Sequence, residues 1–177
     1  MGETRDHQLA PRILIRQPLI SAFMDRHDQW LVECQKLGFE PSPRRYSQGT
    51  VTSEDAAAQI GCEVAQIAKS IVFEGQSCAI IVITSGANKV DRKKKLKAIL
   101  GYKPKIATPG YVLGETGFAP GGVPPFGHKS RSVILMDRDL MGFEVVWGAA
   151  GSSETVFPIP PDLLASISSA RIADVRL

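Results

Sequence analysis

Two short apolar runs near the middle of the chain constrain its fold more than any other feature. Residues 70–73 read Ser-Ile-Val-Phe, residues 79–84 read Ala-Ile-Ile-Val-Ile-Thr, and Gly75 lies between them. β-Branched residues favour strands, and a glycine between two such runs is typical of a hairpin. Because both runs are nearly continuous in apolar residues, we expect them to be central strands of a sheet.

Helical patterns alternate with further short strands along the rest of the chain. Apolar residues at three- and four-residue steps and helix-capping residues predict helices over 18–37, 52–60, 63–68, 91–100, 108–116 and 161–167. The strands expected outside the hairpin cover residues 105–107, 133–136, 144–147, 155–157 and 172–175. Since these elements show no regular βαβ repeat, the pattern favours one mixed α/β domain with a barrel-like sheet flanked by helices.

Length and apolar content set the broad class of protein. The chain has 177 residues, of which 44% are hydrophobic, and this fits one domain with a core. The longest apolar run, residues 78–83, is far too short to span a membrane. Residues 1–17 are charged and lack the apolar block of a signal peptide. We therefore expect a tail at 1–17, a domain at 18–177, no membrane partner and a cytoplasmic location.

The cysteines and histidines do not form a recognisable ligand set. The three cysteines are widely spaced, so neither a disulfide framework nor a zinc site is indicated. We expect no metal and no cofactor, and we expect the cysteines to be buried and reduced. The residues concerned are Cys34, Cys62, Cys78, His7, His27 and His128.

Residues 121–127, Gly-Gly-Val-Pro-Pro-Phe-Gly, form a loop with almost no polar side chains. Glycines let a ligand approach the main chain closely, and prolines fix the path of the chain. Such a loop could grip an amine or hydroxyl, or stabilise an oxyanion, through backbone groups. A purely structural crossover loop explains the composition equally well.

Lys69 stands where the expected helix 63–68 meets the first central strand. A lysine at that junction could project from the sheet edge into a cleft and hold a phosphate or polarise a carbonyl group. The alternative is an ordinary lysine at the end of a strand.

A basic segment follows the second central strand. Residues 85–105 contain eight Lys or Arg residues and one acid, Asp91, although the net charge of the whole chain is only +3. This bias could attract a polyanion such as a nucleic acid, or it could belong to a solvated helix face.

Several of these segments, taken in order, resemble one known family. They are SEDAAAQIGC, IAKSIVFEG, AIIVITSGANKVDRKKKLKAILG, KIATPGYVLGETGFAPGGVPPFGHK and WGAAGSSETVFPIPPDLL. Together they are similar to the YbaK/EbsC family, which includes the editing domain inserted in many bacterial prolyl-tRNA synthetases. The resemblance covers residues 18–177. It implies hydrolysis of the ester that joins a wrong amino acid to the 3′-terminal ribose of tRNA, in trans because this chain lacks a synthetase catalytic domain.

The resemblance also implies roles for particular residues. It places the family's lysine at Lys69, which would organise the tRNA end, and the family's GxxxP loop at residues 121–125, so that Gly121, Gly122 and Pro125 would position the aminoacyl group. Neighbouring positions expected to bind substrate are Ser70, Gly151, Ser152 and His128, the last either in proton transfer or in a supporting position. The basic residues expected to contact the acceptor stem are Arg92, Lys93, Lys94, Lys95 and Lys97.

The implied partners are mischarged tRNA and, as a further candidate, an aminoacyl-tRNA synthetase, with the protein acting as a monomer or weak homodimer. An activated ester needs no strong protein nucleophile, which agrees with the lack of a catalytic triad in the sequence. Two other functions fit the same residues. One is a non-catalytic module that binds a nucleotide or aminoacyl-tRNA, and the other is hydrolysis of an unrelated small ester.

Overall fold

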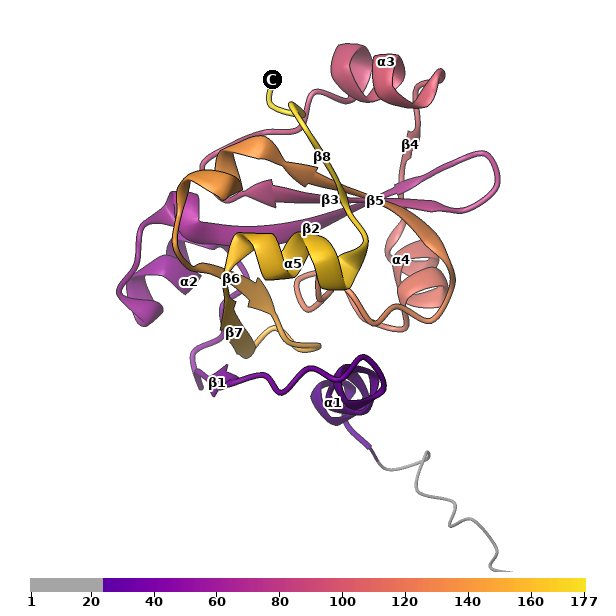
Figure 1. Cartoon of the computed structure of the whole chain (residues 1–177). Helices are drawn as coiled ribbons and strands as arrows, with labels where there is room; N and C mark the ends of the chain where they lie inside the picture. The colour runs from indigo at the N-terminus through magenta and orange to yellow at the C-terminus, as the bar shows by residue number, and fades with distance from the viewer. Residues whose placement is uncertain (1–23) are drawn as a thin grey trace, which may run out of the picture.

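The structure is a computed structural model that describes residues 24–177 (Figure 1). The expected tail at 1–17 and the first part of the helix expected over 18–37 lie outside the described residues. The helices are α1 (Arg26–Lys36), α2 (Ser53–Ile60), α3 (Lys97–Leu100), α4 (Pro109–Thr116) and α5 (Pro161–Ser168), with short turns of other helical types at η2 (Val64–Gln66), η3 (Arg92–Leu96) and η4 (Arg138–Gly142). The strands are β1 (Arg44–Arg45), β2 (Ile67–Glu74), β3 (Ala79–Ser85), β4 (Lys105–Ile106), β5 (Ser132–Asp137), β6 (Val146–Ala149), β7 (Thr155–Ile159) and β8 (Arg171–Ala173).

All eight strands belong to one mixed sheet, which confirms the expected mixed α/β class. Its order is β1-β7-β6-β2-β3-β5-β8, and β4 pairs with β2 off this path. The predicted hairpin is present as the antiparallel pair β2 and β3, in register from Ala68 opposite Ser85 to Glu74 opposite Ala79. The sheet curls, because β6 and β7 turn across the direction of β2 and β3 (Figure 1). Its end strands, β1 and β8, are not paired with each other within residues 24–177.

The curl leaves part of β2 unpaired. One edge of β2 pairs with β3 along seven residue pairs. The other edge pairs with β6 only at Ile67 and Ala68, and with β4 only at Phe73 and Glu74. Residues 69–72 therefore have no partner strand on that edge within the described chain. This gap in the sheet, which includes Lys69, is where the site described below lies.

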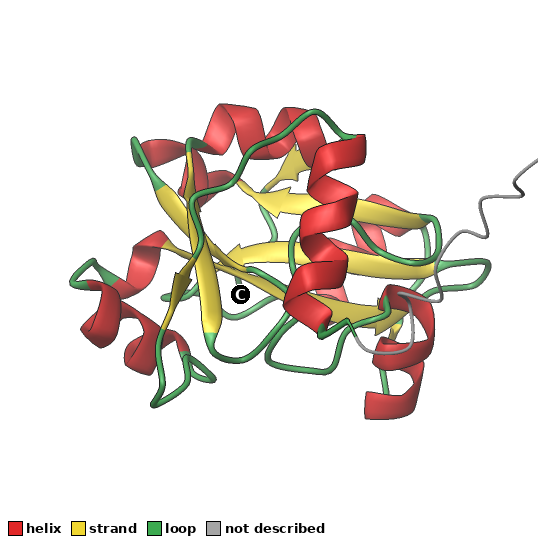
Figure 2. Ribbon diagram, turned by 90° about the horizontal axis from the view of Figure 1, so that it is seen from below, coloured by secondary structure: helices red, strands yellow, loops and turns green. Residues whose placement is uncertain are grey.

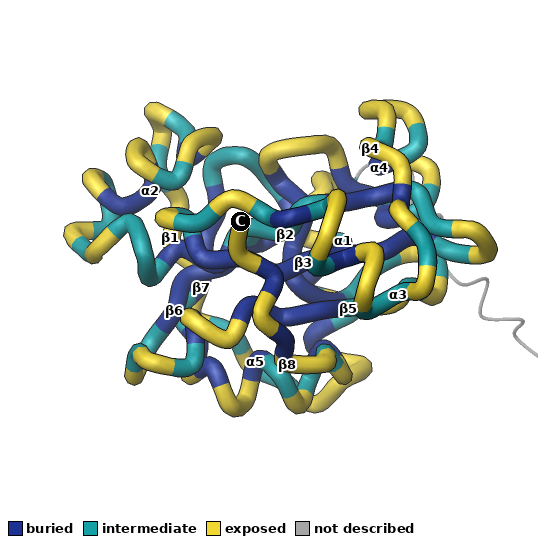
Figure 3. Tube along the Cα trace, turned by 90° about the horizontal axis from the view of Figure 1, so that it is seen from above, coloured by how far each residue is buried: buried dark blue, intermediate teal, exposed yellow. Residues whose placement is uncertain are grey.

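The central strands lie in the core, as expected from their continuous apolar sequence. Every residue of β3 is buried, and Figure 3 shows the same for the middle of the sheet. One face is covered by α1, which lies across the strands when the molecule is seen from below (Figure 2). Its Trp30 is fully buried, and its ring packs against Phe126 and Phe157 with centroids 5.6 and 4.6 Å away. The opposite face is covered by η3, which contributes the fully buried Leu96.

The predicted helix caps are confirmed. The side chains of Thr52, Asp91 and Thr108 each accept a hydrogen bond from the backbone N–H three residues later. The expected glycine stops, which all adopt left-handed backbone conformations, are Gly61, Gly101 and Gly117.

Other expectations about the elements are corrected. Of the helix expected over 63–68, only η2 forms, because a capping box between Glu63 and Gln66 closes the turn and Ile67 already pairs with Trp147. Lys69 is therefore the third residue of β2 rather than a residue at a junction. The first half of the helix expected over 91–100 is the wider turn η3.

The cysteines are only partly as expected. All three are free, and Cys34 is fully buried. Burial raises the pKa of the Cys34 thiol to about 12, so this thiol stays protonated. Cys62 and Cys78 are half-buried, which corrects the expectation that all three are buried, because they lie at a helix end and beside the hairpin turn. Within residues 24–177 no helix is long and apolar enough to cross a membrane.

Candidate functional site

A cavity of about 290 Å³ lies beside the unpaired stretch of β2. Its walls come from β2, from the segment that leads into α2, from the loop after α4 and from β6 and β7. Lys69, Ser70, Gly121 and Val123 all line this cavity, together with Trp147. The curled sheet thus brings the expected lysine and the start of the expected glycine loop to one place, although 52 positions separate Lys69 from Gly121 in the sequence.

Lys69 is half-buried in the cavity wall. It lies opposite Thr84 on β3, whose hydroxyl donates to the buried carboxylate of Asp137 at 3.0 Å. Among residues 24–177, no carboxylate forms a salt bridge with Lys69 and no side chain hydrogen-bonds to it. Since nothing in the described protein occupies its ammonium group, that group can interact with a ligand in the cavity.

Ser70 presents polar groups with no partner in the protein. Its hydroxyl oxygen is buried and has no hydrogen-bond partner within the described residues. The carbonyl of Ile67 accepts from Gly86 at 2.7 Å, on the β3 side. Because peptide groups alternate between the two edges along a strand, the N–H and C=O of Ser70 face the other edge, which is unpaired. Because Ser70 lines the cavity, this unpaired N–H and C=O could pair with a ligand there.

The glycine-rich loop is held rigidly from behind. Gly121 is exposed, whereas residues 122–126 are buried, and Phe118 is buried as well. The indole N–H of Trp30 donates to the carbonyl of Phe126 at 3.2 Å. The loop therefore crosses the core as a structural segment and exposes its main chain to the cavity only at its start.

Backbone donors remain available at the start of the loop. The N–H of Gly122 donates to the carbonyl of Ala119 at 3.0 Å and is therefore occupied. The N–H groups of Gly121 and Val123, which both line the cavity, donate to no backbone carbonyl within residues 24–177. These two amides, rather than that of Gly122, are the loop's candidate donors to a ligand.

His128 supports the loop rather than lining the cavity. Its Nε2 lies 2.6 Å from the carbonyl oxygen of Pro124, so this nitrogen carries the hydrogen and donates it. Burial lowers the pKa of His128 below its ordinary value, and the hydrogen bond to Pro124 opposes this shift more weakly. The ring is therefore neutral near pH 7. His128 thus contacts the loop through Pro124 and is not among the described residues that line the cavity.

Acidification is expected to weaken this support. The unfolded chain binds a proton at His128 near pH 6.5, whereas the folded chain does so only at a lower pH. Its contribution to stability is thus complete above about pH 6.5 and is lost as the pH falls through the lowered pKa of the folded state. Thermal unfolding measured between about pH 7.5 and 5 should show a steep decline for the wild type and a flatter one for His128→Gln, which costs about 1 kcal/mol at neutral pH. Equal pH dependence in the two proteins would contradict this assignment.

Three of the expected site residues lie at a second hollow. Gly122, Gly151 and Ser152 line it together with charged residues of α1 and β1, on the other side of the loop from Lys69. A Cβ atom added to Gly122 would lie 2.9 Å from the backbone of Ser152, so the two segments pack main chain against main chain. At Gly151, where φ is +96°, an added Cβ would lie 2.6 Å from the carbonyl oxygen of Arg26. Both glycines are thus required for close packing.

Ser152 and the expected residue Pro125 also make intramolecular contacts. The hydroxyl of Ser152 lies 2.8 Å from that of Thr155 and accepts from the N–H of Glu154. Pro125 is buried, and its ring carbons would lie 3.3 Å from a Cβ atom added to Gly148. These contacts fix the turn after β6 and the middle of the loop relative to each other.

The sequence did not reveal two features of the cavity. Trp147, which was expected only to be a strand residue, is a buried wall of the cavity. Val51 lies at the cavity with 67% of its surface exposed. For Val51, the available sign of a site in the sequence was an apolar residue directly before the Thr52 helix cap. No pattern marked Trp147 as a cavity residue, because aromatic residues are common in buried strands.

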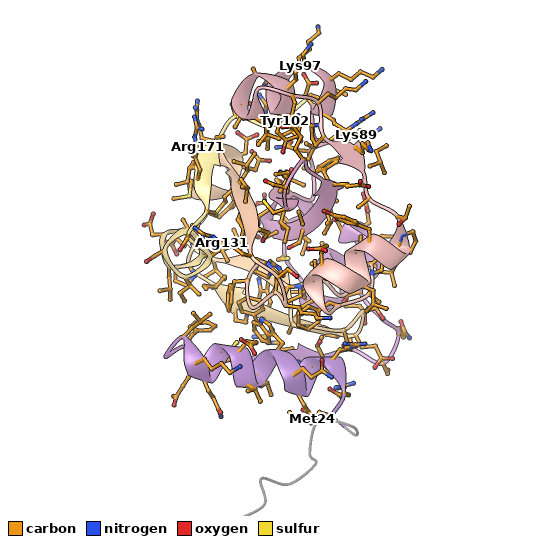
Figure 4. The ribbon with its side chains drawn as sticks, turned by 90° about the vertical axis from the view of Figure 1, so that its right-hand side faces the viewer. Met24, Lys89, Lys97, Tyr102, Arg131 and Arg171 are labelled. Carbon is orange, nitrogen blue, oxygen red and sulfur yellow. The ribbon has the colours of Figure 1, made fainter. Side chains whose placement is uncertain are left out.

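The basic segment lies away from the cavity. Arg92 donates to the carbonyl of Pro104 at 2.9 Å, and Lys95 forms an ion pair with Asp174 at 2.7 Å. Lys93, Lys94 and Lys97 are exposed. Figures 1 and 3 show α3 on the opposite side of the molecule from α2, and in Figure 4 Lys89 and Lys97 extend from the end opposite α1. None of the five expected tRNA-binding residues lines the cavity.

Metal ligands are not grouped anywhere in the part of the chain that the structure describes. Residues 24–177 contain no set of three or more His, Cys, Asp or Glu side chains that could hold a metal ion.

Comparisons with known proteins agree with this architecture. The model of the aminoacyl-tRNA editing domain matches residues 47–167, which span the cavity and the glycine-rich loop. The protein YwhH of Bacillus subtilis, which is uncharacterized, is 32% identical over 145 residues, covering 81% of this chain and 87% of YwhH. EbsC of Enterococcus faecalis, a candidate Cys-tRNA(Pro)/Cys-tRNA(Cys) deacylase, is 21% identical over 146 residues, covering 82% of this chain and 89% of EbsC.

A solved structure of another protein has the same fold. It is that of a candidate trans-editing enzyme for prolyl-tRNA synthetase, and it superposes with a TM-score of 0.83 at 34% identity. The match covers 87% of this chain and 98% of the other.

Proposed function

Because the chain belongs to the aminoacyl-tRNA editing domain family, we propose that it is a trans-acting deacylase that hydrolyses the ester of mischarged tRNA. One observation carries the proposal. An ammonium group without a described partner, the unpaired strand edge at Ser70 and two loop amides without backbone partners all belong to residues that line one cavity. These are the groups needed to hold a polar, activated ester.

The chemistry requires little from the protein. A water molecule forms a bond to the ester carbonyl carbon, the bond from that carbon to the ribose oxygen breaks, and a proton from the water passes to the ribose oxygen. The products are the free amino acid and tRNA with an intact terminal hydroxyl. An aminoacyl ester is already activated, so orientation of the reactants and stabilisation of the oxyanion can supply the rate.

Each cavity group has a proposed role in this reaction. Lys69 holds the terminal nucleotide and favours the negative charge that develops on the carbonyl oxygen. The amides of Gly121 and Val123 donate to the same oxygen. Ser70, through its free strand edge, orients the amino group of the substrate or the attacking water. Gly122, Pro125, Gly151, Ser152 and His128 hold the loop and the neighbouring turn in the required geometry.

A second candidate function is a module that binds aminoacyl-tRNA without cleaving it. Among the described residues, the cavity wall contains no histidine or cysteine, so it lacks a histidine-activated nucleophile, and this observation favours simple binding. A panel of mischarged tRNAs separates the two functions. We expect hydrolysis of at least one small aminoacyl group, among alanine, cysteine, serine and threonine, from tRNA(Pro) or tRNA(Cys). Binding of these tRNAs without turnover would replace the enzyme by the module.

The exposed lysines of the basic segment are proposed to contact RNA away from the reacting end. A variant with Lys93, Lys94 and Lys97 all changed to glutamine should bind tRNA more weakly and with a smaller dependence on salt. If each lysine meets one phosphate, the slope of log K against log salt should become less steep by up to about 3. Lys36→Gln, which changes an exposed lysine on α1, is the control. An unchanged slope in the triple variant would remove this segment from the interface.

A further inference from the structure

The strand β1 consists of two adjacent arginines that have different surroundings. Arg45 forms ion pairs with Glu154 at 3.3 Å and with Asp25 at 3.6 Å, and it lines the second hollow. The guanidinium carbon of Arg44 lies over the ring of Trp147, 4.7 Å from its centroid. Among residues 24–177, no carboxylate forms a salt bridge with Arg44. Successive side chains of a strand point to opposite faces, which explains this difference.

The position of Arg44 in the sheet brings it to the side of the cavity. Arg44 pairs with Val156 on β7, and Val156 pairs with Ala149 on β6. Val156, Ala149 and Trp147 all line the cavity. Paired residues share a face of the sheet, so Arg44 lies on the same face as these three. Two strands, β7 and β6, separate β1 from β2 in the sheet.

We propose that Arg44 binds the 5′-phosphate of the nucleotide whose ribose ester occupies the cavity, so that Arg44 and Lys69 hold the nucleotide from opposite ends. This inference rests on the proposed function for the identity of that nucleotide, the terminal adenosine of tRNA. A guanidinium stacked on an indole keeps its N–H groups free at the edge, where they match the oxygens of a phosphate. The stack also fixes the side chain before binding, so less conformational freedom is lost when the phosphate arrives.

Charge distribution separates this role from that of an ordinary surface arginine. The charge of Arg45 is already balanced by two carboxylates, those of Asp25 and Glu154, and these two ion pairs account for its position. Arg44 has an aromatic neighbour in the cavity wall and no acidic partner among the described residues. The pair therefore provides its own control, since substitution of either residue removes one exposed arginine from the same strand.

Binding of small nucleotides to the full chain tests the proposal without requiring hydrolysis. The probes are adenosine, adenosine 5′-monophosphate and adenosine 3′-monophosphate, titrated into the wild type, Arg44→Gln and Arg45→Gln and followed by NMR or calorimetry. We expect the wild type to bind the 5′-monophosphate at least tenfold more tightly than adenosine, and the 3′-monophosphate to show a smaller gain. Arg44→Gln should lose the preference for the 5′-phosphate with little change in the affinity for adenosine, whereas Arg45→Gln should keep it.

Several outcomes would overturn the proposal. They are equal affinity of the wild type for adenosine and its 5′-monophosphate, no detectable binding of either, or a preserved preference in Arg44→Gln. An equal loss of affinity for all three probes in Arg44→Gln would indicate stacking on the adenine base instead of phosphate binding. Thermal unfolding of each variant shows whether it is folded, and Arg44→Lys, which keeps the charge but not the planar fork, should retain only part of the preference.

This test is distinguishable from a test of the enzyme itself. If the wild type hydrolyses mischarged tRNA and Arg44→Gln does so with an unchanged KM, the inference about Arg44 fails and the proposed function stands. If no mischarged tRNA is hydrolysed but the phosphate preference depends on Arg44, the phosphate site stands and the proposed function fails.

Discussion

Lys69→Ala is expected to lower the single-turnover rate of deacylation by at least about a hundredfold, which is the usual cost of removing one donor to a developing oxyanion. Among the described residues that line the cavity, Lys69 is the only lysine or arginine. Lys69 makes no salt bridge with a described residue, so its loss should change the melting temperature little. Lys69→Met, which keeps most of the aliphatic stem, should be equally inactive and even closer to the wild type in stability.

The measurement is the rate of release of the amino acid from a mischarged tRNA with enzyme in excess. Lys36→Ala, which changes an exposed lysine on α1, is the matched control and should keep the wild-type rate. A folded Lys69→Ala protein that clears the tRNA at the wild-type rate would remove Lys69 from the reaction.

Gly122→Ala is expected to have the second largest effect, on both stability and rate. The added Cβ would lie 2.9 Å from the Cα and carbonyl carbon of Ser152, and these are backbone atoms that cannot rotate away. The loop must shift, at a cost of about 1–3 kcal/mol. Because Gly121 and Val123 flank this residue and supply the proposed donors, a shift of about 1 Å should lower the rate about a hundredfold.

Two other glycines serve as controls for this variant. Gly110 lies on α4 with nothing within 4 Å of an added Cβ, so Gly110→Ala should stabilise the protein by up to about 1 kcal/mol and leave the rate unchanged. Gly121 has a φ of +88° but an open environment, so Gly121→Ala should cost about 1–2 kcal/mol through its backbone alone. Chemical denaturation and the single-turnover assay measure both effects. Wild-type stability of Gly122→Ala would show that the contact with Ser152 is not tight.

Local sequence patterns were sufficient for much of the fold. The hairpin of β2 and β3 followed from two continuous apolar runs, and the caps at Thr52, Asp91 and Thr108 followed from side chains that satisfy the free N–H groups of a helix start. The strand β1 could not be predicted in this way. It consists of Arg44 and Arg45, which carry no apolar alternation, and it is a strand only because β7 offers an edge for pairing.

For the site as well, local sequence patterns identified individual residues but not the contacts between segments that are distant in the sequence. The sequence pointed to Lys69 and Gly121, and both line the cavity. It did not separate Gly121 from Gly122, although their positions on the two sides of the loop depend on the contact between Gly122 and Ser152. The composition of the loop, almost without polar side chains, fits a backbone binding site and a structural crossover equally well. It also reflects burial, since residues 122–126 pass through the core, where polar side chains would be costly.

The most direct test of the account is the position of a bound substrate analogue. A non-hydrolysable 3′-aminoacylamino-adenosine 5′-monophosphate should be soaked into crystals, or titrated into isotope-labelled protein. The account predicts that its aminoacyl carbonyl lies between the Lys69 ammonium group and the amides of Gly121 and Val123. Binding at the hollow beside Gln35 and Phe39, or at the second hollow lined by Gly151, with no contact to Lys69, would contradict it.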